Sequence, residues 1–215
     1  MKKIVIFDLD GTLLNTLADL TESLNLTLRK YNFPEKTIEQ VRNFVGNGVE
    51  KLIERAIPKG KNNSKYDECI NLFKSVYSKN MYNKTAPYDG ILPMLKTIKS
   101  QGLKVAVISN KFDHAVKELC NKYFEKLVDF SAGENEAQGV KKKPAPDTVL
   151  KVLDNFSIDK PYAVYVGDSE VDIQTAINSE IDCISVSWGF KSRVFLSEND
   201  AKIIIDKPDE IFRYL

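Results

Sequence analysis

The sequence predicts an α/β protein: a doubly wound, parallel-sheet (Rossmann-like) core with a smaller all-helical domain inserted after the first strand. Three observations predict it. Short, continuous apolar runs such as Ile4–Phe7 are typical of strands buried on both faces of a parallel sheet. Similar runs alternate with helical patterns from about residue 91 onward. Between about residues 15 and 85 the sequence contains no convincing strand. A chain of 215 residues is long enough for such a core and a small companion domain.

The elements of the core follow one another in a regular order. Apolar, β-branched runs predict strands over residues 3–8, 104–109, 162–167, 182–187 and 202–206. Helical patterns cover residues 91–100, 112–124, 147–156, 171–179 and 209–214. Strands that alternate with helices indicate a parallel sheet with right-handed crossovers. We assign residues 1–14 and 86–215 to this core domain.

The inserted segment, residues 15–85, shows helical patterns only. Its first stripe of apolar residues runs from Leu17 to Tyr31 at helical spacing. Thr37 is a plausible N-cap for a second helical pattern, which Gly46 and Gly48 interrupt. A third stripe covers residues 69–77. We expect these helices to form a separate small domain.

Composition excludes several classes of function. Lys and Arg number 31 against 30 Asp and Glu, so the net charge of +1 gives no general attraction to nucleic acid or to anionic membranes. No apolar run approaches the roughly 18 residues that span a bilayer. A single histidine, His114, argues against histidine-rich metal sites. Three well-separated cysteines suggest reduced thiols. We therefore expect a cytoplasmic protein, monomeric or homodimeric, with no nucleic-acid or membrane partner.

The strongest motif, DLDGT, begins at Asp8, where the first predicted strand ends. Ligands bind at the carboxyl ends of strands in a parallel sheet. Extended backbone turns residues i and i+2 the same way, so Asp8 and Asp10 can face one site. Gly11 permits a sharp turn or the close approach of a ligand. A lone DxD is also compatible with a solvated turn, but the preceding apolar strand makes a functional site the better interpretation.

A second acidic motif, GDSEVD, begins at Gly167, again after a predicted strand. Asp168 and Asp172 are four residues apart, so a helix beginning here would place both on one face. Acidic residues at a helix N-terminus are often only caps, and this alternative stays open for each of them. Together with Asp8 and Asp10 they form an all-oxygen cluster that suits Mg²⁺ rather than Zn²⁺.

Positive and polar groups occur near the ends of other elements. Lys143 belongs to a lysine triplet, and Pro144 favours an extended backbone that presents it. Lys141 and Lys142 are expected to be solvated. Ser109 and Asn110 follow the strand 104–109, where a hydroxyl and an amide can bind phosphate oxygens, although the same pair is common in plain turns.

Taken in order, these motifs resemble those of the haloacid dehalogenase superfamily of phosphohydrolases, and the inserted helices resemble that family's helical cap domain. The resemblance implies that Asp8 is the nucleophile, forming an aspartyl-phosphate, and that Asp10 is the general acid and base. It implies Mg²⁺ held by the Asp8 carboxylate, the Asp10 backbone carbonyl and Asp168, with Asp172 close behind. Lys143 would act as a catalytic and phosphate-binding cation, and the remaining phosphate-binding groups would lie at Leu9, Thr12, Ser109 and Asn110.

Within that superfamily, the segment 42–48 and the Trp188-Gly189-Phe190 triplet resemble phosphoglycolate phosphatases. Gly46 would let a loop approach a small phosphorylated metabolite, and Arg42 or Lys51 would pair with its carboxylate. Related proteins act on pyrophosphate, sugar phosphates or nucleotides, so these substrates remain alternatives. The motifs also bear on three other functions. Asp10 argues against a dehalogenase, Thr12 favours hydrolysis over a phosphosugar mutase, and the intact acidic motifs argue against a non-catalytic phosphate-binding protein.

Overall fold

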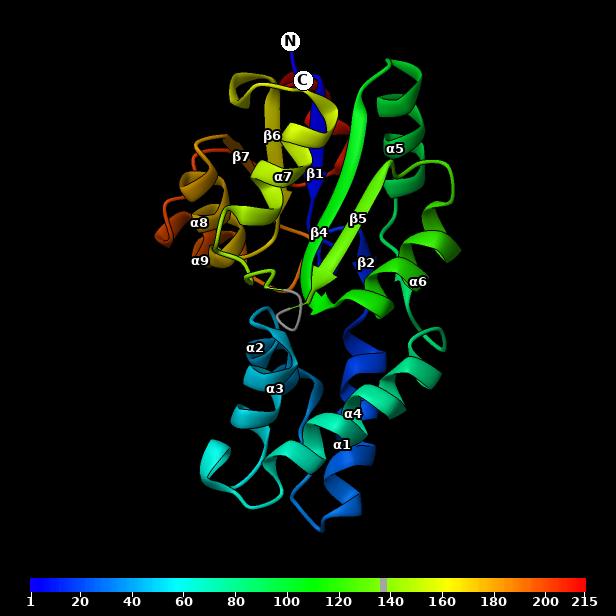
Figure 1. Cartoon of the computed structure of the whole chain (residues 1–215), viewed down its shortest axis with the longest axis vertical. Coiled ribbons are helices and arrows are strands. Elements are labelled where there is room, and N and C mark those ends of the chain that lie inside the picture. Colours follow the sequence, from blue (N-terminus) through cyan, green and yellow to red (C-terminus); the bar gives the residue numbers. More distant parts are fainter. Residues whose placement is uncertain (136–138) are drawn as a thin grey trace. The chain divides into compact units, whose positions relative to one another are not determined.

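The computed structural model describes residues 1–135 and 139–215. It divides the chain into two compact units (Figure 1). One unit contains residues 1–14 and 87–215, and the other contains residues 15–86. The chain passes between them through two short strands, β2 (Leu14–Asn15) and β3 (Ala86–Pro87), which pair in a two-stranded sheet.

The larger unit is built on a six-stranded sheet in the order β5-β4-β1-β6-β7-β8. These strands are β1 (Ile4–Phe7), β4 (Lys104–Phe112), β5 (Phe130–Glu134), β6 (Ala163–Gly167), β7 (Asp182–Val186) and β8 (Ile204–Ile205). The registered pairs, such as Val5 with Val105 on one side and with Val164 on the other, are parallel. All four β1 residues are buried, as an apolar run covered on both faces requires. The predicted doubly wound α/β fold is confirmed.

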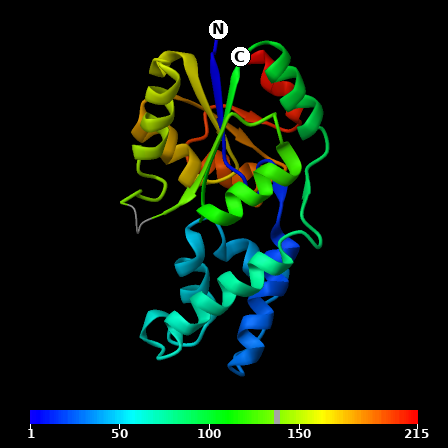
Figure 2. The ribbon, with the colours of Figure 1, turned by 45° about the vertical axis from the view of Figure 1, so that its right-hand side comes forward.

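Helices cover both faces of this sheet. In Figure 2, α5 (Ile91–Ser100) and α6 (Asp113–Phe124) lie on one side of it, and α7 (Asp147–Phe156) and α8 (Glu170–Ser179) lie on the other. Alternate strand residues point to opposite faces. Accordingly Ile4 and Ile6 of β1 pack in one cluster with Val149 and Val152 of α7.

The strand order places a ligand-binding position at the end of β1. After β1 the chain builds β4 and β5 on one side, then crosses to build β6, β7 and β8 on the other. Crossovers on the two sides leave from opposite faces, which opens a crevice at the carboxyl ends of the central strands. Asp8 follows β1 directly, and Asp168 follows β6, the strand paired with it.

The smaller unit is helical. It consists of α1 (Leu17–Lys30), α2 (Ile38–Phe44), α3 (Gly48–Ala56), a short 3-10 helix (Gly60–Asn62) and α4 (Tyr66–Asn80). Thr37 caps α2 as predicted: its hydroxyl accepts a hydrogen bond from the Gln40 N–H, and its own N–H donates to the Gln40 side chain. Leu24 and Leu28 are fully buried, so the first apolar stripe faces the interior of this unit.

One carboxylate is buried in the helical unit. Asp19 of α1 is 1% exposed, and it accepts hydrogen bonds from the backbone N–H groups of Lys84 and Thr85 and from the Thr85 hydroxyl, at 2.8–3.0 Å. These donors lie just before β3. The side chain thereby joins the first helix of the unit to the segment by which the chain leaves it.

Several elements differ from the sequence-based expectation. Strand β5 and helix α9 (Arg193–Glu198) were not predicted. The segment expected as a helix over 209–214 instead forms a 3-10 helix of six residues, Pro208–Arg213. The strand expected over 202–206 is reduced to Ile204–Ile205. Within the described residues, no helix is both long and apolar enough to cross a membrane.

Candidate active site

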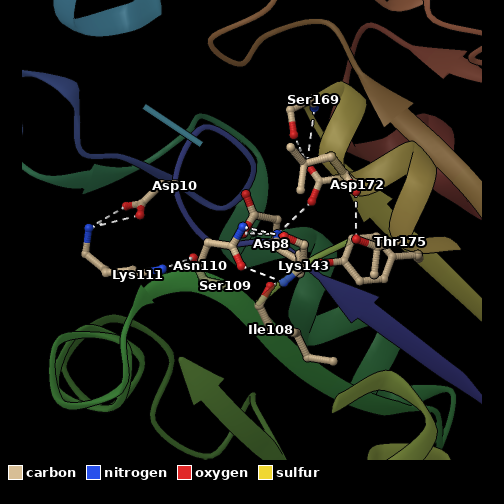
Figure 3. A network of polar contacts seen from close by, with 12 residues as sticks. Asp8, Asp10, Ile108, Ser109, Asn110, Lys111, Lys143, Ser169, Asp172 and Thr175 are labelled. Carbon is tan, nitrogen blue, oxygen red and sulfur yellow. Dashed lines mark hydrogen bonds and ion pairs between the residues drawn. The ribbon is translucent and has the colours of Figure 1, made fainter. Parts of the chain in front are cut away.

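Asp8 lies at the centre of a buried polar network (Figure 3). Its backbone N–H donates to the Val166 carbonyl at 2.9 Å, which continues the pairing of β1 with β6 past the end of the strand. This fixes the backbone from which the carboxylate projects. The side chain itself is almost fully buried.

Lys143 bridges two of the predicted site residues. Its Nζ lies 2.8 Å from Asp8 Oδ1 and 2.7 Å from Asp172 Oδ1. The contact with Asp172 is a hydrogen bond, whereas the contact with Asp8 is an ion pair without hydrogen-bond geometry. The ammonium also lies 5.6 Å from the centre of the Tyr165 ring, which adds a cation–π contact. The lysine is therefore held in place from three directions.

Asp168 and Asp172 come together with Asp8, although by a route that differs from the prediction. Helix α8 begins at Glu170, so Asp168 precedes the helix instead of sharing one of its faces. Asp172 accepts hydrogen bonds from the N–H and hydroxyl of Ser169, the N-cap, and thus also caps the helix. Oxygen atoms of Asp8, Asp168 and Asp172 nevertheless all lie within 4.8 Å of one another. For Asp172, capping and membership of the cluster are compatible.

Two glycines allow backbone to pack against Asp168. A Cβ added at Gly11, where φ is +87°, would stand 2.4 Å from Asp168 Oδ2. A Cβ at Gly189 would stand 2.3 Å from Asp168 Cβ and 2.4 Å from the Gly11 carbonyl oxygen. The next residue, Phe190, donates its N–H to Asp168 Oδ2 at 2.6 Å. Two loops therefore hold this carboxylate, and a larger side chain at either glycine would displace it.

Burial and mutual repulsion change the proton affinities of these groups. Burial, with the nearby Asp172 charge, raises the pKa of Asp8 to about 7, although Lys143 opposes the change. Burial and the charges of Asp172 and Asp8 raise the pKa of Asp168 well above its usual value, against the opposing Phe190 N–H. Burial acts to lower the pKa of Lys143, but Asp172 and Asp8 outweigh it and hold that pKa well above its usual range. The cluster carries more negative charge than Lys143 compensates.

These residues fit a divalent cation. The cluster of Asp8, Asp168 and Asp172 offers only carboxylate oxygens and all three residues are buried. Burial first, and the neighbouring carboxylates second, raise the pKa of Asp8 and of Asp168, so a cation there would stabilise their charged forms. Hard oxygen ligands without histidine or thiolate suit Mg²⁺. The side chain of Asp10 is not part of this group; the resemblance assigned Asp10 to the metal through its backbone carbonyl.

Ser109 and Asn110 are both buried, and they lie within the C-terminal half of β4, which continues three residues beyond the predicted strand. The Asn110 side chain donates to the Lys143 carbonyl at 3.0 Å and accepts from the Lys143 N–H at 2.8 Å. It therefore positions the lysine. The Ser109 hydroxyl accepts a hydrogen bond from the Lys111 N–H at 3.3 Å. Phosphate binding by either residue stays a prediction.

The loop after β1 contains the other predicted phosphate-binding residues. The Leu9 carbonyl accepts hydrogen bonds from the N–H groups of Leu13 and Leu14, which closes the loop into a turn. The Thr12 carbonyl accepts a hydrogen bond from the Trp188 indole at 3.0 Å, and the buried Thr12 hydroxyl makes no hydrogen bond within the described part of the chain. Phosphate binding at Leu9 and Thr12 stays a prediction too.

Lys111 is a buried site residue that no sequence motif indicates. Its Nζ lies 2.9 Å from both carboxylate oxygens of Asp10, and its side chain is only 4% exposed against 18% for that of Asp10. A lysine beside the end of a strand is normally solvated, so no sequence signal marked this one as buried. His114, three residues further on, is exposed on α6. Lys142, which was expected to be solvated, instead pairs with Glu134 at 3.5 Å with its side chain 16% exposed.

The predicted substrate-binding residues of the helical unit are described within that unit only. Arg42 of α2 lies 3.6 Å from Glu39, with its side chain 41% exposed. Gly46 lies between α2 and α3 at a φ of +107°, and a Cβ there would meet no described atom within 4 Å. The open space and positive φ fit an accessible loop. Substrate binding by Arg42 and Gly46 stays a prediction.

Comparison with known proteins identifies the class. A family model described as haloacid dehalogenase-like hydrolase matches residues 5–186. A phosphoglycolate phosphatase of Aquifex aeolicus is 28% identical, covering 99% of this chain and 96% of the relative. One of Pseudomonas savastanoi pv. phaseolicola is 30% identical over 96% of this chain and 77% of the relative. The crystal structure of a candidate phosphoglycolate phosphatase from Lactobacillus delbrueckii subsp. bulgaricus matches with a TM-score of 0.93 at 36% identity, covering 98% of this chain and 97% of that one.

The chain belongs to the haloacid dehalogenase-like hydrolase family. The similarities lie within the phosphoglycolate phosphatase-like part of that family, as the motifs predicted. The predicted class of enzyme, a phosphatase, is confirmed with them.

Proposed function

We propose that this protein is a Mg²⁺-dependent phosphatase that hydrolyses a small phosphate monoester through an aspartyl-phosphate on Asp8, with 2-phosphoglycolate as the first candidate substrate. The buried group of Asp8, Asp168, Asp172 and Lys143 at the ends of β1 and β6 carries the proposal. It places the nucleophilic carboxylate of Asp8 beside the Lys143 ammonium group and among the carboxylates that would hold Mg²⁺.

The reaction proceeds by two displacements. A carboxylate oxygen of Asp8 attacks phosphorus, the bond from phosphorus to the ester oxygen breaks, and Asp10 gives that oxygen its proton. Water then attacks the phosphorus of the aspartyl-phosphate while Asp10 accepts a proton from it. Phosphate leaves and the Asp8 carboxylate is regenerated. The turn after β1 supports the roles of Asp8 as nucleophile and Asp10 as acid and base, because it places both aspartates directly after one strand.

Positive charge must balance an anionic nucleophile and an anionic substrate. Asp8, Asp168 and Asp172 would hold or support Mg²⁺, together with the Asp10 carbonyl. When bound, the ion supplies charge neutralisation and a fixed orientation for the phosphate. Lys143 adds a second charge, and it reaches the site already oriented by Asn110, Asp172 and Tyr165. Ser109 and the loop of Leu9 and Thr12 would contact the phosphate oxygens.

A small substrate suits the role that we propose for the helical unit. We propose that the helical unit, residues 15–86, is a cap whose Arg42 and Gly46 contribute to binding of a small metabolite. The names of the relatives favour phosphoglycolate over sugar phosphates, pyrophosphate or nucleotides. We place the enzyme in the cytoplasm, as a monomer or homodimer.

Release of inorganic phosphate tests the proposal. The purified protein is incubated with p-nitrophenyl phosphate, 2-phosphoglycolate, pyrophosphate, nucleoside monophosphates and hexose phosphates, each with Mg²⁺ and with EDTA. We expect metal-dependent release, greatest from 2-phosphoglycolate. Equal release in EDTA would exclude the metal, and release from none of the compounds would exclude the phosphatase.

A further inference from the structure

Lys111 is a buried cation that the proposed two-step reaction does not use. It follows Ser109 and Asn110 on β4, and both of its contacts with Asp10 measure 2.9 Å. Removing an ammonium group from water is costly unless a specific partner compensates. The chain therefore maintains positive charge at this position at an energetic cost, where an apolar residue would pack more cheaply.

This cation serves a different part of the site from Lys143. Lys143 contacts Asp8 and Asp172, whereas Lys111 contacts Asp10. Figure 3 shows Asp10 and Lys111 on one side of Asp8, and Asp172 with Ser169 on the other. In the proposed reaction the phosphoryl group goes to Asp8 and the leaving oxygen takes its proton from Asp10. Lys111 thus belongs to the leaving-group side.

The distances set what Lys111 can reach. Proton transfer requires the Asp10 carboxyl within about 3 Å of the ester oxygen. Because Lys111 Nζ lies 2.9 Å from that carboxyl, it stands no more than about 6 Å from the ester oxygen. In a phosphorylated 2-hydroxy acid the carboxylate carbon is only two bonds from the ester oxygen. The ester oxygen can therefore contact Asp10 while the carboxylate contacts Lys111.

Resting on the proposed function, we propose that Lys111 is a specificity-determining residue: its ammonium group pairs with a carboxylate carried by the leaving group. The substrates of highest specificity are then phosphate esters of short hydroxy acids. An ester of a neutral alcohol gains nothing from Lys111, which keeps Asp10 as its partner. A carboxylate gains a charge-assisted contact in a site shielded from water, where such contacts are strongest.

The test compares 2-phosphoglycolate with its amide, O-phosphoglycolamide, which has the same shape without the charge. Their kcat/KM ratio is measured with Mg²⁺ for the wild-type protein and for Lys111→Met. We expect the wild type to favour the acid, and K111M to reduce that preference by about 10- to 100-fold, the range for one charged hydrogen bond. Lys99→Met is the matched control, because Lys99 also pairs with an aspartate, Asp129, in the same unit; its ratio should not change.

The kcat/KM ratio of acid to amide shows whether Lys111 recognises the substrate carboxylate or only positions Asp10. If Lys111 only orients Asp10, K111M lowers kcat/KM equally for the acid and the amide, and the inference is overturned. Pyrophosphate, whose leaving group is also anionic, is tested as a further substrate. If K111M loses pyrophosphate hydrolysis but keeps its preference for the acid over the amide, the inference is also overturned. An inactive wild type would instead refute the proposed function itself, and this inference with it.

A second pair of variants covers the case in which K111M does not fold. The double variant Asp10→Asn/Lys111→Met removes both charges of the pair, whereas in Asp10→Asn the amide oxygen still accepts a hydrogen bond from the Lys111 ammonium. Neither variant should turn over substrate, because both lack the Asp10 carboxyl. Calorimetry then gives the affinity of each for the acid and the amide. We expect D10N to prefer the acid and the double variant to lose at least about ten-fold of that preference. Equal preference in both would overturn the proposal.

Discussion

Both units of the molecule bury carboxylates, but they compensate them differently. In the helical unit, Asp19 receives hydrogen bonds from two backbone N–H groups and a hydroxyl. In the sheet unit, Asp8 and Asp168 crowd against Asp172, and Lys143 supplies one positive charge between Asp8 and Asp172. Both arrangements remove charge from water. Only the second leaves three carboxylates against one ammonium group, and there burial, together with the neighbouring carboxylates, raises the pKa of Asp8 and of Asp168.

The comparison separates structural carboxylates from functional ones. A carboxylate surrounded by N–H donors is stabilised in its charged form and needs nothing further, so it stabilises the fold. Carboxylates that repel one another bind a cation or a proton more tightly, because either one reduces the repulsion.

The largest effect is expected at the nucleophile. Asp8→Asn preserves shape but removes the attacking oxygen, so kcat should fall at least about a thousand-fold with little change in the circular dichroism spectrum. Phosphate release under saturating substrate measures it. Normal turnover in a folded Asp8→Asn protein would exclude covalent catalysis by this residue.

The next effect concerns the cation. Asp168→Ala removes one of three clustered carboxylates, so the Mg²⁺ concentration for half-maximal activity should rise at least about ten-fold. A Mg²⁺ titration of phosphate release measures it. Asp19→Asn, in the other unit, provides the control and should leave the titration unchanged. An unchanged curve in Asp168→Ala would remove Asp168 from the metal site.

A stability measurement tests whether Asp19, unlike Asp168, stabilises the fold. Asp19→Ala leaves the N–H groups of Lys84 and Thr85 without their acceptor, so the free energy of unfolding should fall by about 2 kcal/mol. Urea unfolding in EDTA measures it. In the same buffer Asp168→Ala should destabilise the protein less than Asp19→Ala, or even stabilise it, because it relieves repulsion. The reverse order would contradict the distinction.

The smallest effect is a pH dependence. Asp8 has a raised pKa, about 7, in the metal-free fold, whereas in the unfolded chain it ionises near pH 4. The folded state therefore binds the extra proton between these values, and the stability from Asp8 is present at low pH and lost as pH rises towards 7. Mg²⁺ competes with that proton. Its increase of Tm over EDTA should be larger at about pH 8 than at about pH 5; equal increases at both would contradict the assignment.

The sequence was sufficient to predict the sheet core and the acidic cluster because each relies on local signals. Continuous apolar runs mark β1, β4 and β6, and a carboxylate after such a run must lie at the carboxyl edge of the sheet. Thr37 was predictable for the same reason, since a capping box is complete within four residues. Strand β5 gave no such signal: it is an edge strand of five residues, FSAGE, with few apolar side chains.

Other features depend on contacts between distant residues, and these could not be predicted. Lys111 and Asp10 are 101 positions apart, and nothing around either residue indicates their pairing. The same holds for the hydrogen bond from Phe190 to Asp168, because the Trp188-Gly189-Phe190 triplet indicates a resemblance to phosphoglycolate phosphatases but no contact with Asp168. A sequence without aligned relatives shows which groups can do chemistry, while the tertiary fold decides which of them meet.

Trp188 can report on the active-site loop through its fluorescence. It is the chain's single tryptophan, and its indole N–H donates to the carbonyl of Thr12, in the loop that begins with the nucleophile. Indole emission depends on the polarity and hydrogen bonding around the ring. The protein therefore carries one intrinsic fluorophore, attached to the loop where the chemistry is proposed to occur. Changes in that loop during catalysis can be followed by its emission without adding a dye.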